Sequence, residues 1–564
     1  MKALIRYCLE HRLLVFIAFA AIAVAGFVSF SQVPIDAIPD LGENQVIVYA
    51  DWPGRTPKDV EDQVTFPLST ALQGISGVKQ IRGQSGFGFS MIYVIFKENV
   101  DFYFARTRIL EKLSSAAASL PQGVVPTLGP DGTGLGQIFW YTVEGDGHNP
   151  QELRSIQDWY VRYALASVEG VSEVASVGGY VKQYQIDVDP AKIYSYGLKV
   201  SDVVMAVENG NRDVGAKVVE VNGMEFLIRG AGFIKSVEDI NSIVVGSVKG
   251  TPIRIKDIAS VGIGPDFRRG VLNKNGAEAT GGVVVMRYKE NPQAVIKRVK
   301  AKIAEISAGL PQGVTIVPFY DRTGLVEETI GTLQEAILVE IFITVAVILV
   351  FALPFTMSLM ISLTLPFSVL ITFILMNLFK VDMHSMSLAG IIIAIGAIVD
   401  MGIVLTENIH RHMTNSRKAL TDGTLPSLAE DTDTIHRGAS EVAGAVLGAI
   451  GTTLVPFMAI FALQGQSAKL FHPVAYTKTF VLLGSFITAI LLLPPLYLEF
   501  HALKRRFSGV ETGPAGFLMR FFSGKRRTFK IIGAVGIAAG VLVLVERTLR
   551  YFSVTSASPW HALG

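Results

Sequence analysis

One carboxyl group is placed where it could do ion chemistry. Asp400 lies between Gly396 and Gly402 in the run GAIVDMGIVLTEN, inside an apolar stretch, 383–408, that is long enough to cross a membrane. An ionised carboxylate in hydrocarbon costs about 3 kcal/mol or more, so burial favours the neutral form. Asp400 is therefore expected to load and release a proton, the physical basis of proton-coupled transport. The alternative is a permanently protonated, hydrogen-bonded side chain between helices.

Four further titratable residues lie close to apolar stretches. Glu407 follows Asp400 by seven residues, two helical turns, and so lies on the same helix face. Glu407 is either a second relay residue or a solvated residue at the helix end, and the sequence leaves both open. Glu340 is interpreted as an interfacial residue, and His410 and His412 as residues of the cytoplasmic surface.

Methionines are the second chemical candidates, because thioether sulfur binds soft ions such as Cu(I) and Ag(I). Met386 and Met401 lie in the same stretch as Asp400, although methionine in membrane helices more often serves packing. The sequence contains no P-loop, nucleophile elbow, H-E-x-x-H motif or Cys/His cluster, and its one cysteine is Cys8. We therefore expect a protein that is not an enzyme and that has no cofactor.

The elements that must hold these residues are membrane spans. Half of the 564 residues are hydrophobic and only 17% are charged, against about 25% in soluble domains. The balance of 50 basic and 48 acidic residues gives no reason to expect a nucleic acid partner. Uncharged runs predict six spans and a seventh candidate: 13–35, two spans in 341–379 with a hairpin near Pro354, 383–408, 442–468, 479–498 and 531–545.

Basic residues predict the orientation of these spans. They cluster before the first span, in 409–441 and in 499–530, so these three segments are expected in the cytoplasm. The first span is expected to be an uncleaved anchor and not a signal peptide, because its apolar run is long and lacks a convincing cleavage site. No Lys or Arg is predicted deep within any span, since Lys478 falls at the end of one.

The outer segment, 36–335, contains an internal repeat. LPQGVVP at 120–126 recurs as LPQGVTIVP at 310–318, and FKENV and GVKQI recur in the same order as YKENP and GVSEV. The elements predict β-α-β-β-α-β twice, with an insertion at about 190–270. The fold class is thus an α+β membrane protein: a helical bundle of six or seven spans carrying duplicated ferredoxin-like subdomains and an inserted subdomain. The predicted domains are 1–35, 36–136, 137–335, 336–500 and 501–564.

Several stretches resemble the N-terminal half of resistance–nodulation–division (RND) efflux pumps, in the heavy-metal branch. They are PIDAIPDLGENQVIV, YVKQYQIDVDPAKIYSYGL, GPDFRRGVLNKNG, FYDRTGLVEETI, GAIVDMGIVLTENIHRH and KLFHPVAYTKTF, within about residues 1–500. The resemblance implies a multi-pass, trimeric inner-membrane pump driven by protons, working with a periplasmic adaptor and an outer-membrane channel. It also implies that the duplicated subdomains are porter subdomains, that the insertion is a docking subdomain, and that Asp400 is the relay aspartate.

The resemblance favours Cu(I) or Ag(I) as the transported ion. Pumps for divalent ions resemble D-F-G-x-x-x-D-G in this helix, and Ala394 replaces the first aspartate here. Met386 matches a methionine of the copper pumps. Ile398, Leu405 and Phe267 stand where those pumps often have methionine.

Length is the main departure from the family, since a member has about twice this chain. The missing half would supply further spans, porter subdomains and relay residues. A split pump with a partner chain, a homo-oligomer of halves and a truncated product all remain open, and we expect that this chain alone does not transport metal. Outside the pump class, a SecD- or SecF-like subunit of protein translocation and a non-transporting scaffold are the alternatives.

Overall fold

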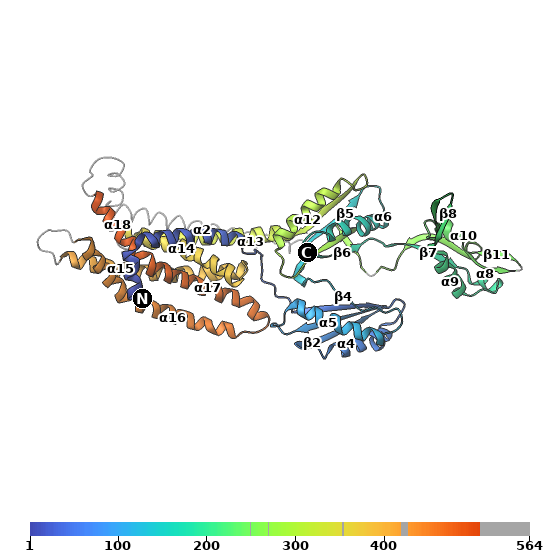
Figure 1. Cartoon of the computed structure of the whole chain (residues 1–564), viewed down its shortest axis with the longest axis horizontal. Coiled ribbons are helices and arrows are strands. Elements are labelled where there is room, and N and C mark those ends of the chain that lie inside the picture. The colour runs from blue at the N-terminus through green and yellow to red at the C-terminus, as the bar shows by residue number, and fades with distance from the viewer. Residues whose placement is uncertain (249, 269, 352–354, 419–426, 508–564) are drawn as a thin grey trace, which may run out of the picture. The chain divides into compact units, whose positions relative to one another are not determined.

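The computed structural model describes residues 1–507 apart from 249, 269, 352–354 and 419–426 (Figure 1). The candidate seventh span at 531–545 and Pro354 lie outside the described residues. The chain forms two compact units. The first holds residues 1–135, 291–294 and 322 onward, and the second holds 136–290 and 295–321.

Within the described residues, six helical segments are long and apolar enough to cross a membrane. This confirms the predicted multi-span bundle. The short helix α1 precedes the first segment, and α17 and α18 together form the sixth. The helices are α1 (Lys2–Glu10), α2 (Arg12–Gln32), α13 (Arg322–Phe351), α14 (Phe355–Phe379), α15 (Ser385–Lys418), α16 (Leu428–Met458), α17 (Gln466–Leu491) and α18 (Leu493–Phe507).

Several helices extend well beyond the apolar windows that predict them. Helix α16 begins at Leu428 and not near 442, because Ser427 and Glu430 form a capping box there. Helix α17 begins at Gln466 and not at 479. Hydrophobic runs mark the part of a helix in lipid, while caps and packing decide where the helix begins and ends.

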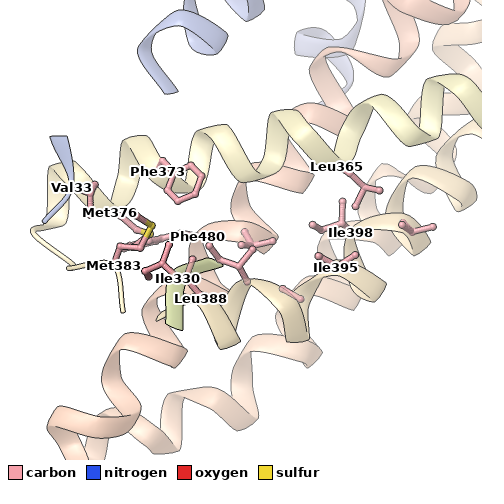
Figure 2. Close-up of a cluster of buried hydrophobic side chains, with 14 of the residues drawn as sticks. Val33, Ile330, Leu365, Phe373, Met376, Met383, Leu388, Ile395, Ile398 and Phe480 are labelled. Carbon is pink, nitrogen blue, oxygen red and sulfur yellow. The ribbon is translucent and has the colours of Figure 1, made fainter. Parts of the chain in front are cut away.

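The interior of the bundle is built from α14, α15 and α17. Helices α15 and α17 approach closely at Gly390, where an added Cβ would lie 2.1 Å from Thr477 Oγ1 and 2.7 Å from the Val474 carbonyl oxygen. Further along both helices, Ser485 donates a hydrogen bond to the Ile398 carbonyl at 3.4 Å. Figure 2 shows the apolar cluster in which α14, α15 and α17 meet the end of α2, with Phe373, Met376, Met383, Leu388 and Phe480 among its members.

The first α+β subdomain has the predicted βαββαβ order. Its four-stranded antiparallel sheet has the order β2-β3-β1-β4. The first connecting helix contains a π-helical segment, η1. The elements are β1 (Gln45–Asp51), α3 (Pro57–Val60), η1 (Glu61–Thr65), α4 (Phe66–Leu72), β2 (Val78–Gly86), β3 (Phe89–Phe96), α5 (Phe102–Ala116) and β4 (Thr127–Leu128).

The second subdomain repeats this topology, because its strands pair in the order β6-β14-β5-β15. Both copies open their first helix with a proline after a capping box, Thr56 with Asp59 and Asn149 with Glu152. The predicted duplication is confirmed. The elements are β5 (Gln137–Gly145), α6 (Pro150–Ile156), η4 (Gln157–Val161), α7 (Arg162–Ala166), β6 (Val171–Gly178), β13 (Leu272–Lys274), β14 (Ala277–Met286), α12 (Pro292–Ser307) and β15 (Val314–Asp321).

The insertion lies between β6 and β13. Strands β7 (Lys182–Val188) and β12 (Ala259–Pro265) pair along their full length, so the chain enters and leaves the insertion side by side. Its own core gathers Ile193, Ile240, Ile255 and Ile258. The other elements are α8 (Pro190–Ser195), α9 (Val200–Gly210), β8 (Val214–Val221), β9 (Met224–Gly230), α10 (Val237–Ser242), β10 (Val244–Val248), β11 (Thr251–Arg254) and α11 (Ile255–Ile258).

Candidate ion-coupling site

Asp400 lies in the membrane-spanning part of α15, on the outer surface of the first unit. Its neighbours on the same helix face, Gly396, Val404 and Glu407, are exposed as well. The spacing of three to four residues makes this one continuous stripe along the helix. Asp400 and Glu407 thus share a face, as the sequence predicts, about 10 Å apart along the axis at 1.5 Å per residue.

Helix α16, which packs against α15, presents small residues to the outside. Gly444, Gly448 and Gly451 are exposed, and an added Cβ at any of them would have no neighbour within 4 Å. Glycines four residues apart allow close approach of another membrane helix. Exposed α15 and α16 therefore combine a carboxylate, which is costly in lipid, with a surface suited to helix packing.

The C-terminal part of α15 forms a polar network with α16. Asn408 is buried and donates to the Gly438 carbonyl at 2.7 Å and to Glu441 at 3.3 Å. Arg411 donates to Asn408 Oδ1 at 2.7 Å, and His412 Nε2 lies 2.5 Å from Glu441 Oε2. The surface interpretation of His412 is therefore incomplete, because its partner lies on the neighbouring helix, 29 residues away.

Met386 is the second residue of α15, fourteen residues before Asp400, and is partly buried. The structure therefore does not bring it next to Asp400, since fourteen residues of helix span about 21 Å. Met357, Met360, Met376, Met383 and Met401 are buried in apolar clusters, as packing residues are. Within the described residues, no three or more His, Cys, Asp or Glu side chains form a group that could hold a metal ion.

Two charged residues, Lys478 and Glu340, have surroundings that their sequence positions do not predict. Lys478 lies near the middle of α17 and is only 8% exposed, so its predicted place at the end of a span is wrong. Its Nζ lies 3.5 Å from the centre of the Phe457 ring, and it makes no ion pair among the described residues. Glu340 in α13 has a buried Oε2 that accepts no hydrogen bond from any described residue. Helix α17 begins thirteen residues before its predicted span, and hydropathy alone could not reveal this.

The bundle of six candidate spans and the duplicated subdomains together define a multi-pass membrane protein. The chain belongs to the AcrB/AcrD/AcrF family, whose model matches residues 4–535. This confirms the predicted RND membership.

Three cation-efflux and metal-resistance proteins are similar to this chain. The putative cation efflux system protein SilA of Salmonella typhimurium is 39% identical over 503 residues, which are 87% of this chain and 47% of that protein. The cation efflux system protein CusA of Escherichia coli (strain K12) is 38% identical, with the same coverage of both chains. The cobalt-zinc-cadmium resistance protein CzcA of Cupriavidus metallidurans is 36% identical.

A solved structure agrees with these relatives. A crystal structure of a heavy metal efflux pump superposes with a TM-score of 0.77 at 28% identity, covering 90% of this chain and 50% of that one. The chain thus spans about half the length of the curated relatives it matches.

Proposed function

We propose that this chain supplies the N-terminal half of a proton-driven pump that exports heavy-metal cations. The observation that carries the proposal is Asp400, exposed beside glycines on one face of the bundle. A carboxylate in that position is costly in lipid and requires a cover of protein. A complementary set of helices would turn Asp400 from a surface residue into a buried proton carrier, with Glu407 as a second relay residue.

Cu(I) and Ag(I) are the proposed ions. Relatives at 39% and 38% identity are cation efflux system proteins that carry the names SilA and CusA. Ala394 replaces the first of the two aspartates expected in pumps for divalent ions, and Met386 offers a soft ligand. The cobalt, zinc and cadmium named for CzcA are the competing cations.

The proposed setting is the inner membrane, in a trimer or in a complex with a C-terminal half, together with a periplasmic adaptor and an outer-membrane channel. The hairpin β8–β9 supports assembly. Strand β9 is exposed along its whole length, including Met224, Phe226 and Leu227. A two-stranded hairpin with no covering layer is marginally stable in water, so a partner surface for it is expected.

Co-expression tests the proposal. In a copper- and silver-sensitive strain that has the adaptor and channel, this chain is expressed alone or with a C-terminal half from a relative. Resistance is expected only from the pair, and Asp400→Asn should abolish it. The control Asp433→Asn alters an exposed residue of α16 that pairs with Arg6 at 3.7 Å, and it should keep resistance.

Three results would contradict the proposal. Resistance from this chain alone would refute the half-pump assignment. Full resistance with Asp400→Asn would refute proton coupling through this residue. A secretion defect with intact metal resistance would favour the translocation alternative.

A further inference from the structure

A buried ion pair joins segments of the first unit that are far apart in sequence. Arg322, the first residue of α13, is 4% exposed. Its Nη2 lies 2.9 Å from both carboxylate oxygens of Asp36, which follows the end of α2. Its Nη1 donates to the carbonyl of Leu135, the last residue of the first unit before the second subdomain begins. One guanidinium therefore contacts the segment after α2, which leads to the first α+β subdomain, and the segment at Leu135, which leads to the second. Arg322 itself begins α13, directly after the second subdomain.

The Asp36 segment is also joined to the beginning of α15. The Asp36 amide donates to the Met383 carbonyl at 2.9 Å, and the Met383 amide donates to the Pro34 carbonyl at 2.9 Å. The Ser385 amide donates to the Ala37 carbonyl at 3.2 Å. Figure 2 shows Met383 packed in the same cluster as Val33 and Leu388. These backbone bonds attach the outer end of α15 to the residue that pairs with Arg322.

Helix α15 runs without a proline from Ser385 to Asp400, a distance of about 22 Å at 1.5 Å per residue. A shift of α15 along its axis must therefore either break the backbone bonds at Met383 and Ser385 or carry Asp36 with it. Asp36 stays paired at moderately acidic pH only if its carboxyl remains ionised. Burial raises the pKa of Asp36, and the charge of Arg322 opposes that rise.

We propose that Asp36 and Arg322 are positioning residues that couple the protonation state of Asp400 to the connections of the two α+β subdomains. The ion pair is the contact through which movement of α15 reaches Leu135 and the beginning of α13. A buried ion pair adds little net stability compared with apolar packing, but breaking it is strongly unfavourable. The Asp36–Arg322 pair therefore suits a role in stabilising one position of α15 relative to another. The inference rests on the proposed function, since it takes Asp400 as the proton carrier.

Hydrogen–deuterium exchange of the full chain in lipid nanodiscs tests this coupling without transport. The readout is the exchange rate of peptides containing the amides of Asp36, Met383 and Ser385. Asp400→Asn mimics the protonated carboxyl, and it should change these rates by about fivefold or more, the lower end of typical coupling between sites. In an Arg322→Gln background, the same substitution should change them less than about twofold. A contact that is merely structural would not respond to Asp400 at all.

Two further variants keep the test decisive. Asp36→Asn preserves shape and should also abolish the response, which covers the case in which Arg322→Gln fails to fold. Arg82→Gln, which breaks an exposed pair with Glu43 at 3.2 Å, should keep the full response. The inference is overturned if Asp400→Asn leaves the exchange rates unchanged in the parent chain. It is also overturned if the response persists in both Arg322→Gln and Asp36→Asn. Because resistance is not measured here, such a failure is distinct from failure of the proposed function.

Discussion

Acidification should destabilise this chain through His384, in the connection between α14 and α15. The ring is 4% exposed, and burial lowers its pKa from 6.5 to about 4. Its Nδ1 accepts from the Ser387 amide at 3.4 Å, and its own amide donates to Ser387 Oγ at 2.8 Å. The folded state therefore holds a neutral imidazole.

The direction in which the free energy of unfolding changes with pH depends on which state binds the proton. Between pH 6.5 and pH 4, the unfolded chain takes up a proton at His384 and the folded chain does not, so stability falls as the pH falls. The stabilising effect is fully present above pH 6.5. With a pKa of about 4 in the folded state, the loss reaches about 2 kcal/mol at pH 5.0, at 1.36 kcal/mol per unit of pKa.

The assay is the free energy of unfolding in mixed micelles at pH 7.5 and pH 5.0, for the parent chain and for His384→Gln. The variant should lose about 2 kcal/mol less on acidification. His148→Gln, which alters a histidine paired with Glu152 at 3.3 Å, should behave as the parent. The raised pKa of Asp36 makes acidification stabilise the folded state. This contribution is the same in the parent and in the variant, so it cancels in the comparison. Equal pH dependence in the parent and in His384→Gln would refute the reasoning.

Three further predictions follow from burial and packing. Arg322→Gln should reduce the free energy of unfolding by about 3–5 kcal/mol, because it leaves Asp36 unpaired, whereas Lys469→Gln removes a half-exposed pair with Glu98 and should cost at most about 1 kcal/mol. Gly390→Ala should cost about 1–3 kcal/mol through overlap with α17, while Gly396→Ala, with open space around it, should not destabilise; thermal unfolding separates the two. Cys8, the sole cysteine, is 5% exposed with a pKa raised by burial, so maleimide should label it at least about tenfold faster after unfolding.

Local patterns of residues were enough to predict most of the architecture. Long uncharged runs predicted the spans because a membrane helix must be apolar over about 20 residues. Three short repeated motifs predicted the duplication, because similar local sequences form similar turns and helix N-termini. Asp400 and Glu407 could be assigned to one helix face from their spacing alone. Their roles in proton transfer remain proposals.

Only the tertiary structure decided which distant residues meet. Asp36 and Arg322 are 286 positions apart, and no periodicity links them. Lys478 is buried because α17 continues through it, and His412 meets Glu441, 29 positions away on α16. Burial and ion pairing depend on how helices pack, and packing is a property of the whole chain that a window of neighbouring residues does not contain.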